Sequence, residues 1–240
     1  MYILSIDTTG PVGSAAVMNT DTGEIRMEFT LAPMEHLKNL MVLTQKLLKE
    51  QSLAPRDLAA VAASAGPGSF TGIRIGVSSA RAVAQALNVP CVSVPTLEMF
   101  RLIADGEHPL AVIFNARRGQ VYGAVYGAEG STVMEPGPYM LTDVLDVIRE
   151  RDLKDVIFYG DGIDAYGDQL WAYEWAPKEQ RYQNAALAAR FAAQKLAEGG
   201  TCTWEELLPL YMRRTEAEQR LEDGSLARAR AAKMAKFRNM

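Results

Sequence analysis

The first part of the chain carries short apolar runs of the length that strands have. Residues 2–6 and 13–18 are almost wholly apolar, and residues 24–31 alternate between polar and apolar positions. Short apolar runs predict buried strands, and strict alternation predicts a strand with one exposed face. Asp21-Thr22-Gly23 separates the second and third runs and predicts a hairpin turn.

The pattern then changes to helical spacing. Within residues 34–50 the apolar positions recur every three to four residues, and Pro33 suits a helix start. A short apolar run at residues 58–64 predicts a fourth strand, and residues 90–94 predict a fifth. A helical pattern lies between them and ends at Asn88. The predicted order of this half is therefore β-β-β-α-β-α-β.

A weaker copy of the same order follows. Three strands are predicted, then a helix with Thr142 as its N-cap, a fourth strand, and a turn that leads into a helix. An alanine-rich helix comes next and stops at Gly199-Gly200. The duplicated βββαβα order predicts an α/β fold with two similar subdomains. The ranges are 110–115, 121–126 and 132–135 for the strands, 142–150 for the helix, then 155–159, 160–170 and 185–198.

A glycine-rich turn precedes the second helix of the first half. It reads Gly66-Pro67-Gly68-Ser69-Phe70-Thr71-Gly72, and its glycines allow torsions and close approaches that other residues forbid. In the helix itself a glycine or alanine recurs every four residues, which leaves one face almost bare of side chains. Each helical glycine costs about 1 kcal/mol relative to alanine. We therefore expect the strip to be a docking surface for another helix, of this chain or of a partner. Its members are Gly72, Gly76, Ala80 and Ala84.

Composition excludes several classes of protein. With 240 residues, 48% hydrophobic residues and a net charge of -4, the chain reads as an ordinary globular protein and not as a nucleic-acid binder by overall charge. No apolar run approaches the roughly 20 residues that a membrane span needs, and the N-terminus lacks a basic region typical of a signal peptide. We expect a cytoplasmic protein with no membrane association.

Two local features remain open in this composition. Cys91 and Cys202 lie far apart without CxxC spacing, so the sequence suggests neither a disulfide framework nor a zinc site. After Asp223 no acidic residue occurs, while Arg and Lys supply five positive charges. Such a basic end is typical of a solvated helix, and the alternative is contact with RNA phosphates.

Asp7-Thr8-Thr9 follows the first strand directly. It resembles the first phosphate loop of the actin, sugar-kinase and Hsp70 superfamily, in which an acidic residue helps to hold Mg²⁺ near nucleotide phosphates. The alternative is a strand followed by an ordinary Asx or Ser/Thr turn. The glycine turn matches neither GxGxxG nor GxxxxGK[ST], so the dinucleotide and P-loop interpretations fail.

Catalytic and metal-binding patterns are weak. The two histidines, His36 and His108, are far apart, and Leu40 stands where His36 would need a second histidine on its helix. Ser69 does not sit in a GxSxG sequence. We therefore predict no catalytic residue and no metal site. Arg117 and Arg118, in the turn that begins at Asn115, are candidates for contact with an anion or an acidic partner; a solvated hairpin turn is the alternative.

Four motifs taken together resemble one family. They are the Asp7-Thr8-Thr9 start, the glycine stretch 66–76, the arginine turn 116–122 and Pro209-Leu210-Tyr211-Met212-Arg213. They are similar to the TsaB family of bacterial tRNA threonylcarbamoyladenosine biosynthesis proteins, long labelled glycoprotease-like. The resemblance runs from Met1 to about Glu218, and one departure is Asn115, where the family usually has Asp.

This resemblance implies two actin-like subdomains. Residues 1–100 would form the N-terminal subdomain with the partner-binding helices. Residues 101–212 would form the second, with a C-terminal helix packing back, and residues 213–240 a charged tail with a basic end. The Asp7-Thr8-Thr9 sequence would then be a vestigial phosphate loop.

The resemblance also implies a function. The chain would be a non-catalytic scaffold subunit that binds and activates TsaD, a paralogue with a paired-histidine metal site. TsaD transfers threonylcarbamoyl from its adenylate to N6 of adenosine 37 in tRNAs that read ANN codons. A P-loop ATPase, TsaE, would join the pair, and tRNA would be reached through the complex. The chain alone would be a homodimer without a cofactor of its own, and a nucleotide could sit at the partner interface. The alternative is an ATP-dependent enzyme of the actin-like superfamily or a peptidase.

The implied partner interface lies on the two helices of the first half. If it does, Gly76→Leu should block the heterodimer and leave the fold intact. The expected interface residues are His36, Leu37, Leu40, Met41, Thr44, Leu47, Ser69, Gly72, Gly76, Ala80, Val83 and Ala84.

Overall fold

The structure is a computed structural model that describes residues 1–30 and 36–213, with residues 36–39 described by backbone alone. Its first half is built on a five-stranded sheet of order β3-β2-β1-β4-β5. The central strand β1 pairs antiparallel with β2 and parallel with β4, so Leu4 lies opposite Val17 on one side and Val61 on the other. The strands are β1 (Tyr2–Asp7), β2 (Ser14–Asn19), β3 (Ile25–Phe29), β4 (Leu58–Gly66) and β5 (Cys91–Pro95).

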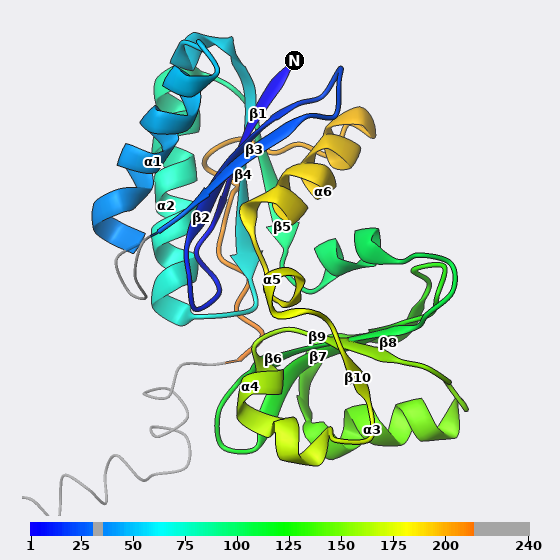
Figure 1. The fold of residues 1–240 in the computed structure, drawn as a ribbon. Coiled ribbons are helices and arrows are strands. Elements are labelled where there is room, and N and C mark those ends of the chain that lie inside the picture. The colour runs from blue at the N-terminus through cyan, green and yellow to red at the C-terminus, as the bar shows by residue number, and fades with distance from the viewer. Residues whose placement is uncertain (31–35, 214–240) are drawn as a thin grey trace, which may run out of the picture. The chain divides into compact units, whose positions relative to one another are not determined.

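Helices cover both faces of this sheet (Figure 1). On one face lie α1 (His36–Glu50) and α2 (Phe70–Leu87), which pack over Leu4 and Ile6. On the other face lies α6 (Ala185–Ala197), to whose first carbonyl the buried Ser5 hydroxyl donates a hydrogen bond of 2.6 Å. Alternate residues of β1 thus serve opposite layers, as a strand buried on both faces requires.

The second half repeats the first. Its sheet has the order β10-β9-β6-β7-β8, so in both sheets the third, second, first, fourth and fifth strands of the half lie side by side in that order. Helix α3 (Leu141–Glu150) packs on this sheet through Val144 and Ile148. The predicted fold class, α/β with two actin-like subdomains, is confirmed. The strands are β6 (Leu110–Asn115), β7 (Gln120–Tyr126), β8 (Thr132–Met140), β9 (Ile157–Tyr159) and β10 (Glu174–Trp175).

Some elements differ from the sequence-based expectation. Helix α3 begins at Leu141, and its N-cap is Met140, whose N–H donates to the Asp143 carboxylate at 2.9 Å; Thr142 as N-cap was wrong. Strand β8 continues to Met140 because it pairs along the whole of β7. The short elements that the sequence did not predict are η1 (Pro55–Asp57), η2 (Glu98–Ile103), α4 (Gly162–Tyr166), η3 (Gly167–Gln169) and α5 (Lys178–Arg181). Two of these short helices, α4 and η3, replace the single helix expected within residues 160–170.

The segment after α6 returns to the first sheet. Gly199, with φ +76°, stops the helix as predicted. Cys202 then pairs with Cys91 on β5, Leu207 is fully buried, and the Leu210 N–H donates to the Ala65 carbonyl at 2.7 Å. One compact unit thus runs from Met1 to Leu210. Of the charged tail predicted over residues 213–240, all but Arg213 lies outside the described residues. Within the described ranges no helix is long and apolar enough to cross a bilayer.

Candidate functional site

The bare strip of α2 is buried inside the chain. Gly72, Gly76, Ala80 and Ala84 are all buried. A Cβ at Gly72 would overlap the Thr8 carbonyl oxygen, and one at Gly76 would lie 2.5 Å from the Thr8 hydroxyl oxygen. The strip is therefore not an open docking surface. Its glycines let α2 approach the end of β1, and Gly76→Leu would disrupt the fold instead of testing a partner contact.

The glycine turn is fastened to the Asp7-Thr8-Thr9 loop. The Ser69 N–H donates to the Thr9 carbonyl at 2.8 Å, and the Thr8 hydroxyl donates to the Gly72 carbonyl at 2.6 Å. Gly68 has φ +155°, and a Cβ there would lie 2.6 Å from the Thr9 carbonyl oxygen. The Ser69 hydroxyl accepts the Gly72 N–H and so caps α2. The chain's own backbone thus fills the space beside this loop.

Asp7 is fully buried, and both of its carboxylate oxygens are engaged. Oδ1 accepts the Thr9 N–H at 2.9 Å and the Thr9 hydroxyl at 3.0 Å, and Oδ2 accepts the Ser64 hydroxyl. Burial raises the pKa of the Asp7 carboxyl, and the hydrogen bonds from Ser64 and Thr9 oppose that effect. A hydrated Mg²⁺ needs an accessible carboxylate oxygen. The residues present at this loop do not fit a Mg²⁺–nucleotide site.

The interface residues expected on α1 and α2 divide into two groups. Seven are buried in the chain and so form its core: Leu40, Thr44, Leu47, Gly72, Gly76, Ala80 and Ala84. That part of the expected surface is corrected, because the apolar stripe of an amphipathic helix packs on its own sheet first. Met41 and Ser69 are exposed and Val83 is half-buried; the side chains of His36 and Leu37 lie outside the described residues.

Large apolar side chains remain exposed on the outer side of these helices. Met41 and Val42 on α1 are 41% and 61% exposed, and Phe70 at the start of α2 is 38% exposed. The Arg74 guanidinium lies over the Phe70 ring, 4.0 Å from its centroid. Sequence periodicity could have identified Val42, because it falls outside the buried stripe of α1 and is apolar.

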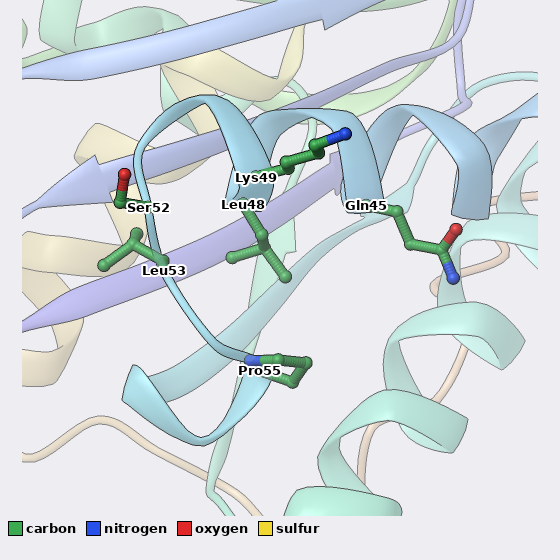
Figure 2. Close-up of a pocket in the computed structure, with 6 residues that line it drawn as sticks. All are labelled: Gln45, Leu48, Lys49, Ser52, Leu53 and Pro55. Atoms are coloured by element: carbon green, nitrogen blue, oxygen red, sulfur yellow. The ribbon is translucent and has the colours of Figure 1, made fainter.

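A hollow of about 360 Å³ lies at the C-terminal end of α1 (Figure 2). Its six lining residues are Gln45, Leu48, Lys49, Ser52, Leu53 and Pro55. The chain turns sharply here, because Ser52 adopts φ +55° and the Leu53 N–H returns to the Leu48 carbonyl at 2.8 Å. Gln45 lies one helical turn beyond Met41, so the hollow continues the exposed apolar side of α1. Three of its lining residues are apolar, and Gln45, Lys49 and Ser52 add polar groups to it.

The arginine turn of the second half is held by a hydrogen-bond network. Arg117, Arg118 and Gly119 all have positive φ, of +64°, +57° and +77°. The Asn115 side chain accepts the Arg117 N–H at 2.8 Å, and the Asn115 N–H donates to Asp161 at 3.1 Å. Both arginine residues are exposed. Asn115 thus fixes the turn without a charge of its own.

Asp161 was missed by sequence reasoning. It follows β9, as the glycine turn follows β4. Burial raises the pKa of the Asp161 carboxyl to about 6; the hydrogen bond from the Asn115 N–H opposes this shift, and the nearby Asp164 adds to it. Tyr166 adds a hydroxyl 3.3 Å from the Gln120 carbonyl oxygen. The signal in the sequence was the Gly160-Asp161 pair at a strand end, but its contact with Asn115 spans 46 residues.

Metal-ligand chemistry finds little support in the part of the chain described. His108 lies 3.0 Å from the Asp105 carboxylate, whose hydrogen bond raises the pKa of the imidazole. No group of three or more His, Cys, Asp or Glu side chains in the described ranges is placed to hold a metal ion.

Known proteins are similar to this chain over most of its length. The family model described as TsaD, tRNA N6-adenosine threonylcarbamoyltransferase, matches residues 30–220. The tRNA threonylcarbamoyladenosine biosynthesis protein TsaB of Bacillus subtilis is 36% identical over 67% of this chain and 71% of the relative. The protein of the same name from Escherichia coli is 29% identical over 92% of this chain and 98% of the relative.

A solved structure supports the fold. A Pseudomonas aeruginosa protein described as similar to the peptidase YeaZ superposes with a TM-score of 0.72 at 24% identity, over 88% of this chain and 99% of that one. The chain therefore belongs to the family that the threonylcarbamoyltransferase model describes, and within it to the TsaB proteins of tRNA threonylcarbamoyladenosine biosynthesis.

Proposed function

We propose that the chain is a non-catalytic subunit of the assembly that forms N6-threonylcarbamoyladenosine at position 37 of tRNAs reading ANN codons. In this assembly it binds the catalytic paralogue TsaD and holds it in an active arrangement, and TsaE joins the pair. The proposal is supported most directly by the exposed apolar residues of α1, Met41 and Val42, in a chain of this family.

The exposed side of α1 and the start of α2 suit a protein partner. Met41, Val42 and Phe70 are apolar side chains that are each more than a third exposed, although the same helices bury a complete apolar stripe on the sheet. Exposed apolar groups that lie together mark interaction sites, and Met41 and Val42 are neighbours in the sequence of α1. With the hollow beside Leu48, they supply a protruding part and a recess, which a stable interface of about 800 Å² per partner needs for shape complementarity.

The non-catalytic role rests on the state of the polar residues. Asp7 is buried and engaged with Ser64 and Thr9, so the loop that resembles a phosphate loop has no free carboxylate oxygen to offer. The two histidines of the sequence are 72 positions apart (108 minus 36) and do not form the paired motif expected of the catalytic paralogue. Both features argue against the alternative of an ATP-dependent enzyme.

The arginine turn is a second proposed contact. Arg117 and Arg118 are exposed on a backbone with three successive positive φ values, fixed by Asn115. An arginine presented on a rigid turn loses less conformational entropy when it binds a carboxylate or phosphate. We assign this turn to an anionic group of a partner of the assembly.

The proposal is tested by the mass in solution of the chain mixed with TsaD from the same organism. The wild-type chain should form a 1:1 complex. Val42→Glu should weaken that complex at least tenfold, about 1.4 kcal/mol, because a carboxylate would be buried in an apolar interface. Trp171→Glu is the matched control, since Trp171 is 82% exposed and lies in the second half of the chain, just before β10 of the other sheet. A complex formed equally well by both variants would place the interface elsewhere.

A further inference from the structure

The two cysteines of the chain lie opposite each other at the edge of the first sheet. Cys91 opens β5, the edge strand, and Cys202 lies in the segment that returns after α6. The Cys91 N–H donates to the Cys202 carbonyl at 2.8 Å, and the Cys202 N–H donates to the Cys91 carbonyl at 2.9 Å. Residues paired in this way point their side chains to the same side of the sheet. Cys202 accordingly packs on the buried cluster that contains Cys91.

The backbone spacing of such a pair suits a disulfide. Directly hydrogen-bonded residues of antiparallel strands have Cα atoms about 5.5 Å apart. Disulfides join residues whose Cα atoms are roughly 4.4 to 6.8 Å apart. Both cysteines are free thiols in this structure. The sequence separation of the two residues hid this pairing, because only the fold brings them together.

The two thiols differ in access. Cys91 is fully buried, and Cys202 is partly exposed, so an oxidant in solution reaches Cys202 first. Burial raises the pKa of the Cys91 thiol to about 11, the neighbouring Cys202 adds to this shift, and Arg81 opposes it. Burial also raises the pKa of Cys202. Because the thiolate is the reactive form, both groups are expected to react slowly at neutral pH and faster in alkali.

We propose that Cys91 and Cys202 are a redox-sensitive pair that closes as an intramolecular disulfide with a small-molecule disulfide as oxidant. The Cys202 thiolate attacks one sulfur of the oxidant, forms a mixed disulfide and releases one small thiol. Cys91 then loses its proton, attacks the Cys202 sulfur and releases the second small thiol. Two protein thiols are oxidised to one disulfide, and one small disulfide is reduced to two thiols.

The disulfide would clamp the returning segment onto the first sheet. Leu207 fills the core beside β4, and the Leu210 N–H bonds to Ala65. The Leu210 carbonyl oxygen would be only 2.5 Å from a Cβ at Gly66, so this segment also lies against the glycine turn. Closing the bond would disfavour local opening of residues 202–210 and so hold the turn in place. This device does not depend on the proposed function.

The test uses the full chain in buffers with graded ratios of oxidised to reduced glutathione, at neutral and alkaline pH. The intact mass should fall by two hydrogens, neither cysteine should remain open to alkylation after denaturation, and the reaction should be faster in alkali. Hydrogen exchange at the Leu210 amide should slow by about tenfold or more on oxidation and recover with dithiothreitol. Cys91→Ser should stop at one glutathione on Cys202, without the change at Leu210.

Two results for the wild-type chain would contradict the proposed disulfide. A wild-type chain that ends as a mixed disulfide on Cys202, with Cys91 still open to alkylation, would overturn the proposal. Disulfide-linked dimers as the main product would overturn it as well. Both results come from the wild-type chain, so they test the proposed disulfide even if the Cys91→Ser variant fails to fold.

Discussion

At the scale of single residues, there is no room for a Cβ at two glycines where α2 meets the end of β1. Gly72 faces the Thr8 carbonyl, Gly76 faces the Thr8 hydroxyl, and Asp7 is enclosed by Ser64 and Thr9. The sequence showed which residues share the bare face of α2 but not what packs on that face. Small residues recur every four positions both in a helix that packs on its own sheet and in a helix that packs on a partner, so the repeat does not distinguish the two. Contacts made across 64 residues, such as Thr8 to Gly72, decide between them.

Gly72→Ala tests this close approach. Alanine is the better helix former by about 1 kcal/mol, so an open position would become more stable. Here the added methyl would overlap the Thr8 carbonyl, and we expect a net loss of about 2 kcal/mol or more in the free energy of unfolding. Urea denaturation measures it. Ser78→Ala, at an exposed position of the same helix, is the control and should gain a few tenths of a kcal/mol, roughly. A gain at Gly72 would show that the strip is open.

Asp161 gives a prediction of pH dependence. Its pKa is about 6 in the folded chain and near the ordinary 3.8 when unfolded, so between these values the folded state binds more protons. Stability therefore falls as pH rises from about 4 to 6, by at most about 3 kcal/mol and by less because the side chain is partly exposed. Asp161→Asn can still accept the Asn115 N–H.

The variant should therefore be more stable than wild type at pH 8, by about 1 to 2 kcal/mol, and nearly equal to it at pH 4. Denaturation curves at the two pH values give this difference directly. An equal effect at both pH values, or a loss at pH 8, would mean that the ionised carboxylate is not disfavoured in the folded chain.

At the scale of elements, α1 has two apolar sides with different roles. Leu40, Leu47 and Leu48 pack on the sheet, while Met41 and Val42 face solvent. Helical period alone predicted the element and its buried stripe. It could not separate the core from a partner surface, because both need apolar residues. Strand β10 was missed for another reason: two residues, Glu174 and Trp175, are too few to show alternation.

Alanine substitutions on α1 should separate the two sides. Leu47→Ala should lower the free energy of unfolding by about 2 to 5 kcal/mol, because it leaves a cavity beside the sheet. Val42→Ala should change it by less than about 0.5 kcal/mol, since the side chain is mostly in solvent. Thermal or chemical denaturation of the chain alone measures both. A similar loss for the two variants would mean that Val42 contributes to the core of the chain.

At the scale of the whole molecule, the two halves place polar residues at equivalent positions. In the first half, β1 ends at Asp7, which accepts a hydrogen bond from Ser64 near the end of β4. In the second half, β6 ends at Asn115, whose N–H donates to Asp161 just after β9. The duplicated order of strands and helices could be predicted from the sequence, because apolar residues have a different spacing in strands and in helices. The bonds between strand ends could not, since they join residues 46 and 57 positions apart.

We propose that this chain activates a catalytic paralogue and performs no transfer itself. The most direct measurement is threonylcarbamoyladenosine formed in tRNA by purified TsaD and TsaE from the same organism, supplied with threonylcarbamoyl-adenylate, with and without this chain. We predict that product forms efficiently only when the chain is present, that Val42→Glu fails to support it, and that Trp171→Glu supports it fully. Product formed by TsaD and TsaE at the same rate without the chain, or by the chain alone, would show that the chain does not have this activating role.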